Sequence, residues 1–294
     1  MTIDSQSSST PVQPIQPYLS CLQVVMVNTT LPANIGSAAR AMHTMGLSRL
    51  TVVDPKLPID DTSISHAAGG SDLLAAATIS PTLETAIADC QLVFAASSRS
   101  RHMPRPVVTP TQAAKIMLDF IDNQQALNEQ NDRDTAPNIA ILFGREDRGL
   151  TNEELAFADY HIQIDANPDY PVLNVASAVQ VIASFIFAYA QTHVSADKNS
   201  CNATGNKDNK ASDNDMSPML NTYVRQQWDE PAITQQQLQQ LTTRVTQLMV
   251  ERGLADSNHL RALPLRLSRL ASRIQLDQKE YQLLSALIAK LLKD

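Results

Sequence analysis

Glycine-rich ligand-binding motifs are missing from this sequence. The chain has 8 glycines among 294 residues, and they form neither the GxGxxG motif of dinucleotide-binding domains nor the GxxxxGK[ST] phosphate loop. The GxSxG motif of serine hydrolases and the HExxH motif of zinc peptidases are also absent. A nucleotide-dependent oxidoreductase is therefore only an alternative, because its usual glycine fingerprint is not there.

Cysteines and long apolar runs are scarce as well. Cys21, Cys90 and Cys201 show no CxxC or Cys–His spacing, so we expect no metal site and reduced thiols in a cytoplasmic protein. No run of 18 apolar residues exists, since polar residues interrupt the best candidate at 175–190, and we expect no membrane span. Residues 1–17 lack the features of a secretory signal and are expected to form a flexible tail.

The balance of charge changes along the chain. The formal net charge is −7, which argues against a globally basic nucleic-acid binder. Residues 1–220 hold 23 acidic and 13 basic residues, a net of −10, whereas residues 221–294 hold 7 and 10, a net of +3. The two parts are therefore expected to have different tasks.

Residues 18–191 have the pattern of an α/β domain. Short apolar runs alternate with helical segments, which predicts a mostly parallel sheet with helices on both faces. The predicted strands are 22–27, 50–53, 91–96, 138–143 and 161–164. The predicted helices are 34–45, 65–76, 83–88, 111–121, 151–158 and 174–191.

Two polar stretches interrupt this pattern. Residues 122–136 are expected to form a surface excursion, and residues 192–220 a flexible linker. Beyond the linker, residues 221–294 contain only helical periodicity, which predicts a small all-α module. Its three helices are predicted at 233–250, 259–274 and 277–292.

The first chemical motif, NIGSAARAMHTMG, follows the first predicted strand. Gly36 and Arg40 lie one helical turn apart. Because Gly36 has no side chain, we expect a ligand to be able to approach the guanidinium of Arg40. The alternative is an arginine that is solvated or paired with an acid. Gly46 is expected to end this helix in a left-handed conformation.

The second motif is a basic loop after the third strand. The segment SSRSRHMPR contains Arg99 and Arg101 among its cations and no acid, which suits phosphate contacts but is equally compatible with an ordinary basic loop.

Two further motifs follow the fourth and fifth strands. In FGREDRGLTNEEL, Gly144 lets a ligand approach the backbone, and Thr151 or Asn152 is expected to cap the next helix. In IDANPDYPVLNVASAVQVIA, Pro168 and Pro171 stiffen a loop that can present backbone groups to a flat ligand.

These four motifs, in this order, resemble those of the SPOUT class of S-adenosylmethionine-dependent RNA methyltransferases, and most closely the TrmJ-type tRNA (cytidine/uridine-32) 2′-O-methyltransferases. The resemblance extends over residues 22–190, with a helical C-terminal extension in the same place. It implies a homodimer with a C-terminal trefoil knot in the catalytic domain, a tRNA substrate and no metal. The implied donor-binding residues are Ala96, Ser97, Ser98, Gly144, Ile164, Pro171, Val172 and Leu173.

The resemblance also implies catalytic and RNA-binding roles. Arg40 matches the family's catalytic arginine, with Asn34 in the same motif, and Arg99 and Arg101 would face RNA. Because a guanidinium gives up its proton very reluctantly, we expect Arg40 to stabilise the developing alkoxide and to orient the ribose.

Two features leave alternatives open. The family usually has serine where this chain has Val172, so a catalytically weak or inactive RNA-binding homologue is the alternative function. Between residues 258 and 276 the C-terminal module has arginines and no acid, a pattern that fits either RNA binding or a solvated helix surface. The arginines predicted to bind RNA there are Arg266, Arg269 and Arg273.

Overall fold

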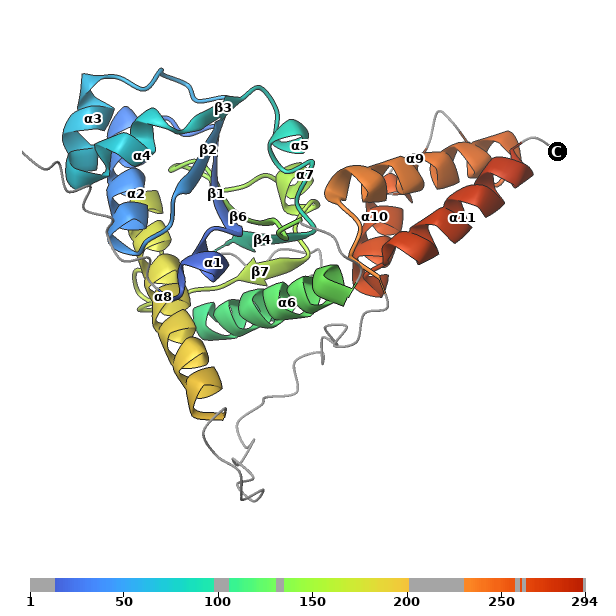
Figure 1. Cartoon of the computed structure of the whole chain (residues 1–294). Helices are drawn as coiled ribbons and strands as arrows, with labels where there is room; N and C mark the ends of the chain where they lie inside the picture. Colours follow the sequence, from blue (N-terminus) through green and yellow to red (C-terminus); the bar gives the residue numbers. More distant parts are fainter. Residues whose placement is uncertain are drawn as a thin grey trace, which may run out of the picture.

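The computed structural model describes residues 14–97, 106–130, 135–200, 230–256, 260 and 263–292, with the backbone alone for 196–200. Its centre is a seven-stranded sheet in the order β3-β2-β1-β6-β4-β7-β5, and every neighbouring pair is parallel (Figure 1). The strands are β1 (Leu22–Val27), β2 (Arg49–Val53), β3 (Thr78–Ser80), β4 (Leu92–Ala96), β5 (Val107–Val108), β6 (Ile139–Phe143) and β7 (Tyr160–Ile162).

Helices pack around this sheet and form a separate C-terminal module. In the α/β domain they are α1 (Gln16–Leu19), α2 (Pro32–Thr44), α3 (Asp61–Ala67), η1 (Ala68–Gly70), α4 (Ser71–Ala75), α5 (Leu83–Ala86), α6 (Pro110–Gln130), α7 (Asn152–Leu155) and α8 (Val175–Ser200). In the module they are α9 (Gln235–Glu251), α10 (Leu263–Ile274) and α11 (Gln278–Leu291).

The predicted parallel sheet is confirmed, and β1, β2, β4, β6 and β7 lie within two residues of the predicted strands. Strands β3 and β5 were not predicted. They have three and two residues and lie at the two edges of the sheet. Such short edge strands do not carry the continuous apolar run that identifies a strand buried on both faces.

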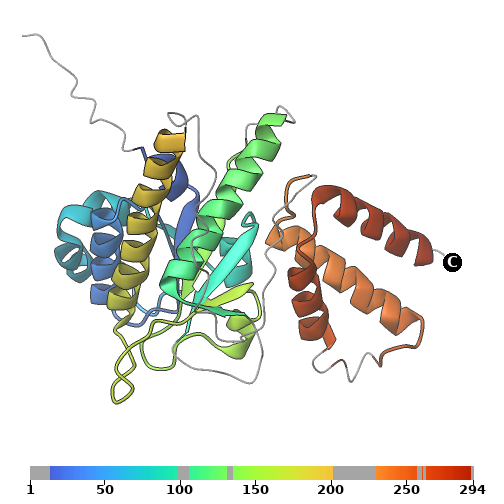
Figure 2. The same cartoon turned by 90° about the horizontal axis from the view of Figure 1, so that it is seen from below.

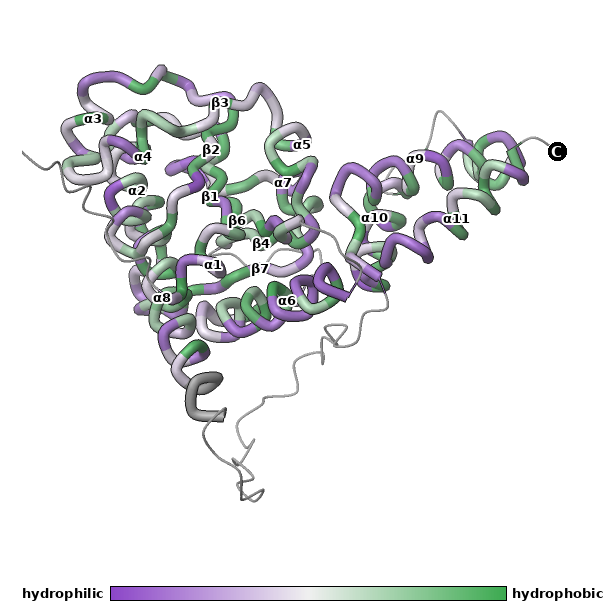
Figure 3. The backbone as a smooth tube through the Cα atoms, in the orientation of Figure 1, coloured by the Kyte–Doolittle hydropathy of each residue, from purple (hydrophilic) through white to green (hydrophobic). Residues whose placement is uncertain are grey.

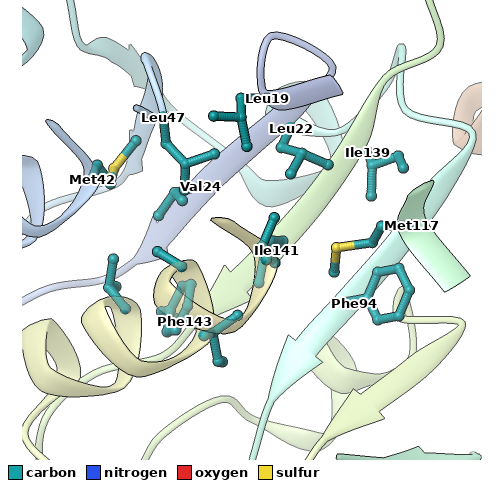
Figure 4. Close-up of a cluster of buried hydrophobic side chains, with 14 of the residues drawn as sticks. Leu19, Leu22, Val24, Met42, Leu47, Phe94, Met117, Ile139, Ile141 and Phe143 are labelled. Atoms are coloured by element: carbon teal, nitrogen blue, oxygen red, sulfur yellow. The ribbon is translucent and has the colours of Figure 1, made fainter. Parts of the chain in front are cut away.

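Both faces of the sheet are buried. Along β1, Val24 and Met26 belong to one core cluster, while Val25 and Val27 belong to another. Helices α2, α6 and α8 supply the first cluster, and α5 and α7 supply the second. Figure 4 shows the first cluster, with side chains of β1 and β6 in contact with those from the covering helices.

Helix α2 buries the face that the sequence predicts, but Gly36 has a different structural role from the predicted one. Ile35, Ala39 and Met42 are fully buried, and Gly46 has the predicted positive φ of 70°. A Cβ atom on Gly36 would lie 2.0 Å from the carbonyl oxygen of Ser63. The expected open approach to Arg40 is therefore wrong, because the missing side chain lets α3 pack against α2.

Three predicted helix boundaries differ from those of the structure. Helix α6 continues to Gln130 instead of ending near 121, and it buries Gln124 and Leu127 in the stretch expected to be a surface excursion. Helix α8 continues to Ser200, beyond the predicted start of the linker at 192. Residues 1–17 were expected to form a tail, but α1 begins at Gln16. The predicted helix at 65–76 is broken into α3, η1 and α4.

Helix α8 is apolar enough to be compared with a membrane span. Residues 175–195 have the length and composition of a spanning helix. In the fold, however, α8 packs against α2 and α6 and supplies Val179, Ile182 and Ile186 to the core. Alternating green and purple bands along α6 in Figure 3 show the amphipathic pattern of its neighbour. Helix α8 is thus a core helix of the α/β domain.

The C-terminal module packs beside the α/β domain, next to α6 (Figures 1 and 2). The backbone N–H groups of Gln235 and Gln236, in the first turn of α9, donate to the carbonyl oxygens of Cys90 and Ala88 at 2.8 and 3.2 Å. The side-chain oxygen of Gln124 accepts a hydrogen bond from the backbone of the module at 2.9 Å. These bonds fix the module at its α9 end.

Candidate active site

A pocket lies at the carboxyl ends of β4, β6 and β7, where parallel sheets commonly bind ligands. Its volume is about 130 Å³. The loops after the three strands supply seven of the eight predicted donor-binding residues, and the eighth, Ser98, lies outside the described residues. The seven are Ala96, Ser97, Gly144, Ile164, Pro171, Val172 and Leu173.

The lining of the pocket combines an apolar part with a charged part. Ile162, Ile164 and Leu173 supply apolar surface, while Arg145 and Glu146 belong to a segment of four consecutive charged residues. The pocket therefore offers both apolar and charged surface to a ligand.

The loop after β6 is held by its own tight turn. A Cβ atom on Gly144 would lie 2.2 Å from the backbone of Gly149 and Leu150, so glycine is required by the turn itself. The sequence alone predicted a different reason for Gly144, namely that a ligand comes close to the backbone there. Thr151 caps α7 as predicted, in a capping box with Glu154.

Arg145 links this loop to the end of β1. Its guanidinium donates to the side-chain oxygen of Asn28 and lies 3.0 Å from the carboxylate of Glu154. Asn28 has a positive φ of 50° and donates in turn to the carboxylate of Asp54 at 2.7 Å. Arg145 and Glu154 are both mostly buried, so this ion pair fixes one wall of the pocket.

Glu146 links the same loop to the start of α2. Its carboxylate accepts hydrogen bonds from the backbone of Thr30 and Leu31 at 3.0 and 3.2 Å and from the side chain of Asn34 at 2.7 Å. Burial alone would raise the pKa of Glu146. The hydrogen bonds that its carboxylate accepts together outweigh this effect, so the pKa lies below the ordinary value of a glutamate. The N-cap residue of α2 has no side chain that accepts a hydrogen bond from the first turn of the helix. The carboxylate of Glu146 therefore supplies the negative charge at this end of α2.

Asn34, predicted to be catalytic, is buried and has partners for both ends of its amide. Besides donating to Glu146, it accepts a hydrogen bond from the side chain of Asn174 at 3.0 Å. The side chain of Asn174 also accepts from the backbone of Ala176 in the first turn of α8. Asn34 thus joins the start of α2 to two segments that border the pocket.

Arg40 lies outside this pocket. Its side chain is exposed on α2, it is not among the residues that line the pocket, and it forms no side-chain hydrogen bond or ion pair with the residues that the structure describes. A single chain therefore does not bring the predicted catalytic arginine into the pocket.

The predicted RNA-binding arginines divide into two groups. Arg99 and Arg101 lie outside the described residues. Arg266 and Arg273 are exposed on α10, and Arg269 is half-buried. Their spacing of three and four residues places them on one side of the helix.

Sequence reasoning did not assign the residues that connect the loops, namely Asn28, Arg145, Glu146 and Asn174. One signal was available, since four consecutive charges in a tight loop are unusual without partners. The identity of the partners depends on which strand ends become neighbours, and that order follows from the fold.

Comparisons with known proteins agree with this geometry. The model of the SpoU rRNA methylase family matches residues 21–184. The tRNA (cytidine/uridine/adenosine-2′-O-)-methyltransferase TrmJ of Pseudomonas aeruginosa is 32% identical over 272 residues, which cover 92% of this chain and 94% of that protein. TrmJ of Cronobacter sakazakii is 44% identical over 165 residues, 56% of this chain, and the match spans 62% of its length, less than two thirds.

Solved structures give the same result. TrmJ from Z. mobilis ZM4 superposes with a TM-score of 0.68 at 25% identity, over 92% of this chain and 98% of that one. A probable methyltransferase from Bordetella pertussis has a TM-score of 0.54 at 32% identity, over 60% and 99%. The four motifs, the parallel sheet and these matches lead to one conclusion: the chain belongs to the SpoU rRNA methylase family.

Proposed function

We propose that this protein is a cytoplasmic enzyme that transfers a methyl group from S-adenosylmethionine to the ribose 2′-oxygen of cytidine or uridine at position 32 of the tRNA anticodon loop. The observation that carries this assignment is the convergence of the loops after β4, β6 and β7 on one pocket. The nearly full-length similarity to a TrmJ tRNA methyltransferase supports the substrate class.

The donor would be held by the residues that line the pocket. Ile164 and Leu173 would contact its base, and the backbone of Ala96 and Gly144 would face its polar groups. When bound, S-adenosylmethionine would supply a methyl group on a sulfonium: the 2′-oxygen would take the methyl group, a neutral thioether would leave, and the 2′-hydroxyl proton would pass to solvent. Because a thioether is a good leaving group, the reaction needs no metal. The chain's own residues would bind the ribose, orient it and exclude water.

Arg40 would act on the ribose of the RNA. Its guanidinium keeps its proton, so it would stabilise negative charge on the 2′-oxygen and hold the neighbouring phosphate. Because Arg40 does not line the pocket of its own chain, we assign this role to a homodimer in which α2 of one subunit faces the pocket of the other. The trefoil knot implied by the family motifs belongs to the same proposal.

The RNA would be held by arginines on both parts of the chain. Arg99 and Arg101 follow β4, next to the pocket in sequence, and would contact phosphates near the reacting ribose. Arg266, Arg269 and Arg273 on α10 would add contacts farther along the tRNA.

Measuring donor binding and methyl transfer separately tests this function. Calorimetry with S-adenosylmethionine is expected to show binding, and incubation with tRNA from a strain that lacks this modification is expected to give methylated product. The absence of both would refute the assignment.

Val172 motivates the second candidate function, an RNA-binding homologue with little or no catalysis. It lines the pocket and is 54% exposed, but it has no hydroxyl with which to position a substrate. In that case tRNA would bind without product, and Val172→Ser would raise turnover. If wild-type turnover is robust and Val172→Ser leaves it unchanged, this second function is excluded.

A further inference from the structure

A second hollow lies at the opposite edge of the sheet from the candidate active site. It is bordered by the amino ends of β1, β2 and β3 and by helix α5, which packs against β2 and β3 (Figure 1). Its volume is about 340 Å³, which is within the range of small-molecule sites. We call it the amino-edge hollow. The lining residues that matter here are Gln23, Arg49, Thr51, Thr78 and Thr85.

The floor of the hollow is polar, although the neighbouring strands are apolar on the same face of the sheet. On the face that α5 covers, β4 and β6 contribute Val93, Ala95, Ala140 and Leu142 to the second core cluster. A sheet face covered by helices is normally apolar in this way. The strand register instead places five polar residues of β1–β3 on this face. They are Gln23, Arg49, Thr51, Thr78 and Ser80.

The polar floor is buried in part and has a donor to spare. Gln23 and Thr51 are 8% and 5% exposed. The side-chain amide of Gln23 donates to the hydroxyl oxygen of Thr51 at 2.8 Å and to the carbonyl oxygen of Ala86 at 3.2 Å. The hydroxyl hydrogen of Thr51 has no acceptor among the described residues. Because an unused donor in a buried place costs free energy, a ligand that accepts a hydrogen bond from Thr51 would be stabilised.

Arg49 gives the hollow a positive charge. Its half-buried guanidinium donates to the side-chain oxygen of Asn138 at 2.6 Å, and to the carbonyl oxygen of Ser20 and the side-chain oxygen of Gln23 at 3.4 Å each. All three acceptors are neutral, and no carboxylate of the described residues forms an ion pair with Arg49. A guanidinium has five N–H groups, so the three bonds leave donors for a ligand. No aspartate or glutamate lines the hollow.

The available donors come from several directions and fit a phosphate group. Arg49 and Thr51 lie on β2, Thr78 lies on β3, and Thr85 lies on α5. A tetrahedral phosphate has acceptor oxygens in several directions, whereas a planar carboxylate has two, and arginine binds phosphate through strong charge-assisted hydrogen bonds. The volume also leaves room for the molecule that carries the phosphate, since one water takes about 30 Å³. We propose that the amino-edge hollow binds the phosphate group of a larger ligand.

Two other classes of ligand match the hollow less well. A cation would meet the guanidinium of Arg49 without any carboxylate on the lining. An apolar molecule would cover the hydroxyl of Thr51 without accepting its hydrogen bond.

An NMR titration of the full-length ¹⁵N-labelled protein with inorganic phosphate tests this site. The Nε–Hε signal of Arg49, identified by its loss in Arg49→Lys, is expected to shift and to saturate. Acetate at the same ionic strength should bind at least tenfold more weakly. This result does not depend on methyl transfer, so the site and the proposed enzymatic function can fail separately.

A change of charge on the floor provides the matched variants. Thr78 is exposed on an edge strand, and Thr78→Asp should weaken phosphate binding by tenfold or more through repulsion. Thr62→Asp adds the same charge at an exposed position of α3 that does not line the hollow, and should leave phosphate binding unchanged. Circular dichroism checks the fold. If Thr78→Asp disturbs it, Thr78→Val, which suits a strand, should still weaken binding measurably.

The source of the phosphate group is identified with two larger probes, adenosine 5′-monophosphate and bulk tRNA. A small molecule is the ligand if the mononucleotide shifts the Arg49 signal at lower concentration than inorganic phosphate does and Thr78→Asp leaves tRNA affinity unchanged. The RNA backbone is the ligand if tRNA shifts the same signal and Thr78→Asp weakens tRNA binding.

Three outcomes would overturn the proposal. The first is an Arg49 signal that phosphate does not shift, or that acetate shifts equally well. The second is phosphate binding that the substitutions of Thr78 leave unchanged. The third is binding of inorganic phosphate with no tighter binding of either larger probe, which would indicate an adventitious ion only.

Discussion

At the scale of single residues, Glu146 connects the pocket to the helix that carries Arg40. Its carboxylate caps the start of α2 from a different loop and holds Asn34, which is also bonded to Asn174. The loop after β6, the start of α2 and the start of α8 therefore form one hydrogen-bonded unit. A ligand that displaces the loop must also disturb α2.

The lowered pKa of Glu146 predicts a pH effect on stability. Above pH 4.5, the ordinary pKa of a glutamate, the ionised carboxylate stabilises the folded state. This contribution is lost as the pH falls through the lower pKa that Glu146 has in the folded protein. Glu146→Gln should therefore lower the melting temperature at neutral pH, with a difference that shrinks below pH 4.5. Thermal unfolding from pH 3 to pH 7 measures it, with Glu84→Gln as the exposed control. A difference that is independent of pH would contradict this role.

Substitution of Arg40 should separate turnover from folding. Arg40→Ala removes an exposed side chain without partners among the described residues, so the melting temperature and donor affinity should stay unchanged. Turnover should fall on the order of 10²–10³-fold, as for other donors that stabilise an oxyanion. Lys115→Ala, which removes an exposed ion pair on α6, is the control. Near-normal methylation by Arg40→Ala would remove this residue from the mechanism.

The residues that line the pocket could be predicted, whereas those that support them could not. Gly144, Ile164 and Leu173 lie in motifs that follow predicted strands, and parallel strands end at one edge of a sheet. Glu146 and Asn174 act through partners that are more than 100 residues away, and sequence spacing contains no information about such contacts.

At the scale of elements, the contact between α2 and α3 depends on glycine. Gly36→Ala would place a Cβ atom against the backbone of Ser63, which cannot move as a side chain can. Overpacking of this kind typically costs about 1–3 kcal/mol. Gly69→Ala is the matched control, because its Cβ atom would meet nothing within 4 Å. Denaturant unfolding of both variants measures the difference, and equal stabilities would show that α3 does not pack as described.

The elements that were predicted poorly are those whose extent depends on packing. Helix α6 continues through a polar sequence because Gln124 and Leu127 are buried there, and Gln124 holds the module. Strand β5 exists only because Val107 and Val108 pair with β7. Local sequence patterns identify the interior strands, but the edges and ends are decided by neighbours from elsewhere in the chain.

At the scale of the whole molecule, charge is divided between an acidic α/β part and a basic module. If α10 binds phosphates, Arg266→Gln/Arg273→Gln should weaken tRNA binding without changing donor affinity. The plot of log affinity against log salt concentration has a negative slope, and its magnitude should decrease by about one for each phosphate that the variant no longer neutralises. Arg244→Gln on α9 is the control. Filter binding from 50 to 300 mM salt measures the slopes, and an unchanged slope would show that α10 is only a solvated surface.

The most direct test of the proposed activity is to map the transferred methyl group. Labelled S-adenosylmethionine is incubated with the protein and with tRNA that lacks the modification, and the labelled nucleotide is then located. The account predicts label on the ribose of cytidine or uridine at position 32, appearing on the order of 10²–10³-fold more slowly with Arg40→Ala. Label on a base, on a nucleotide outside the anticodon loop, or on no tRNA at all would contradict it.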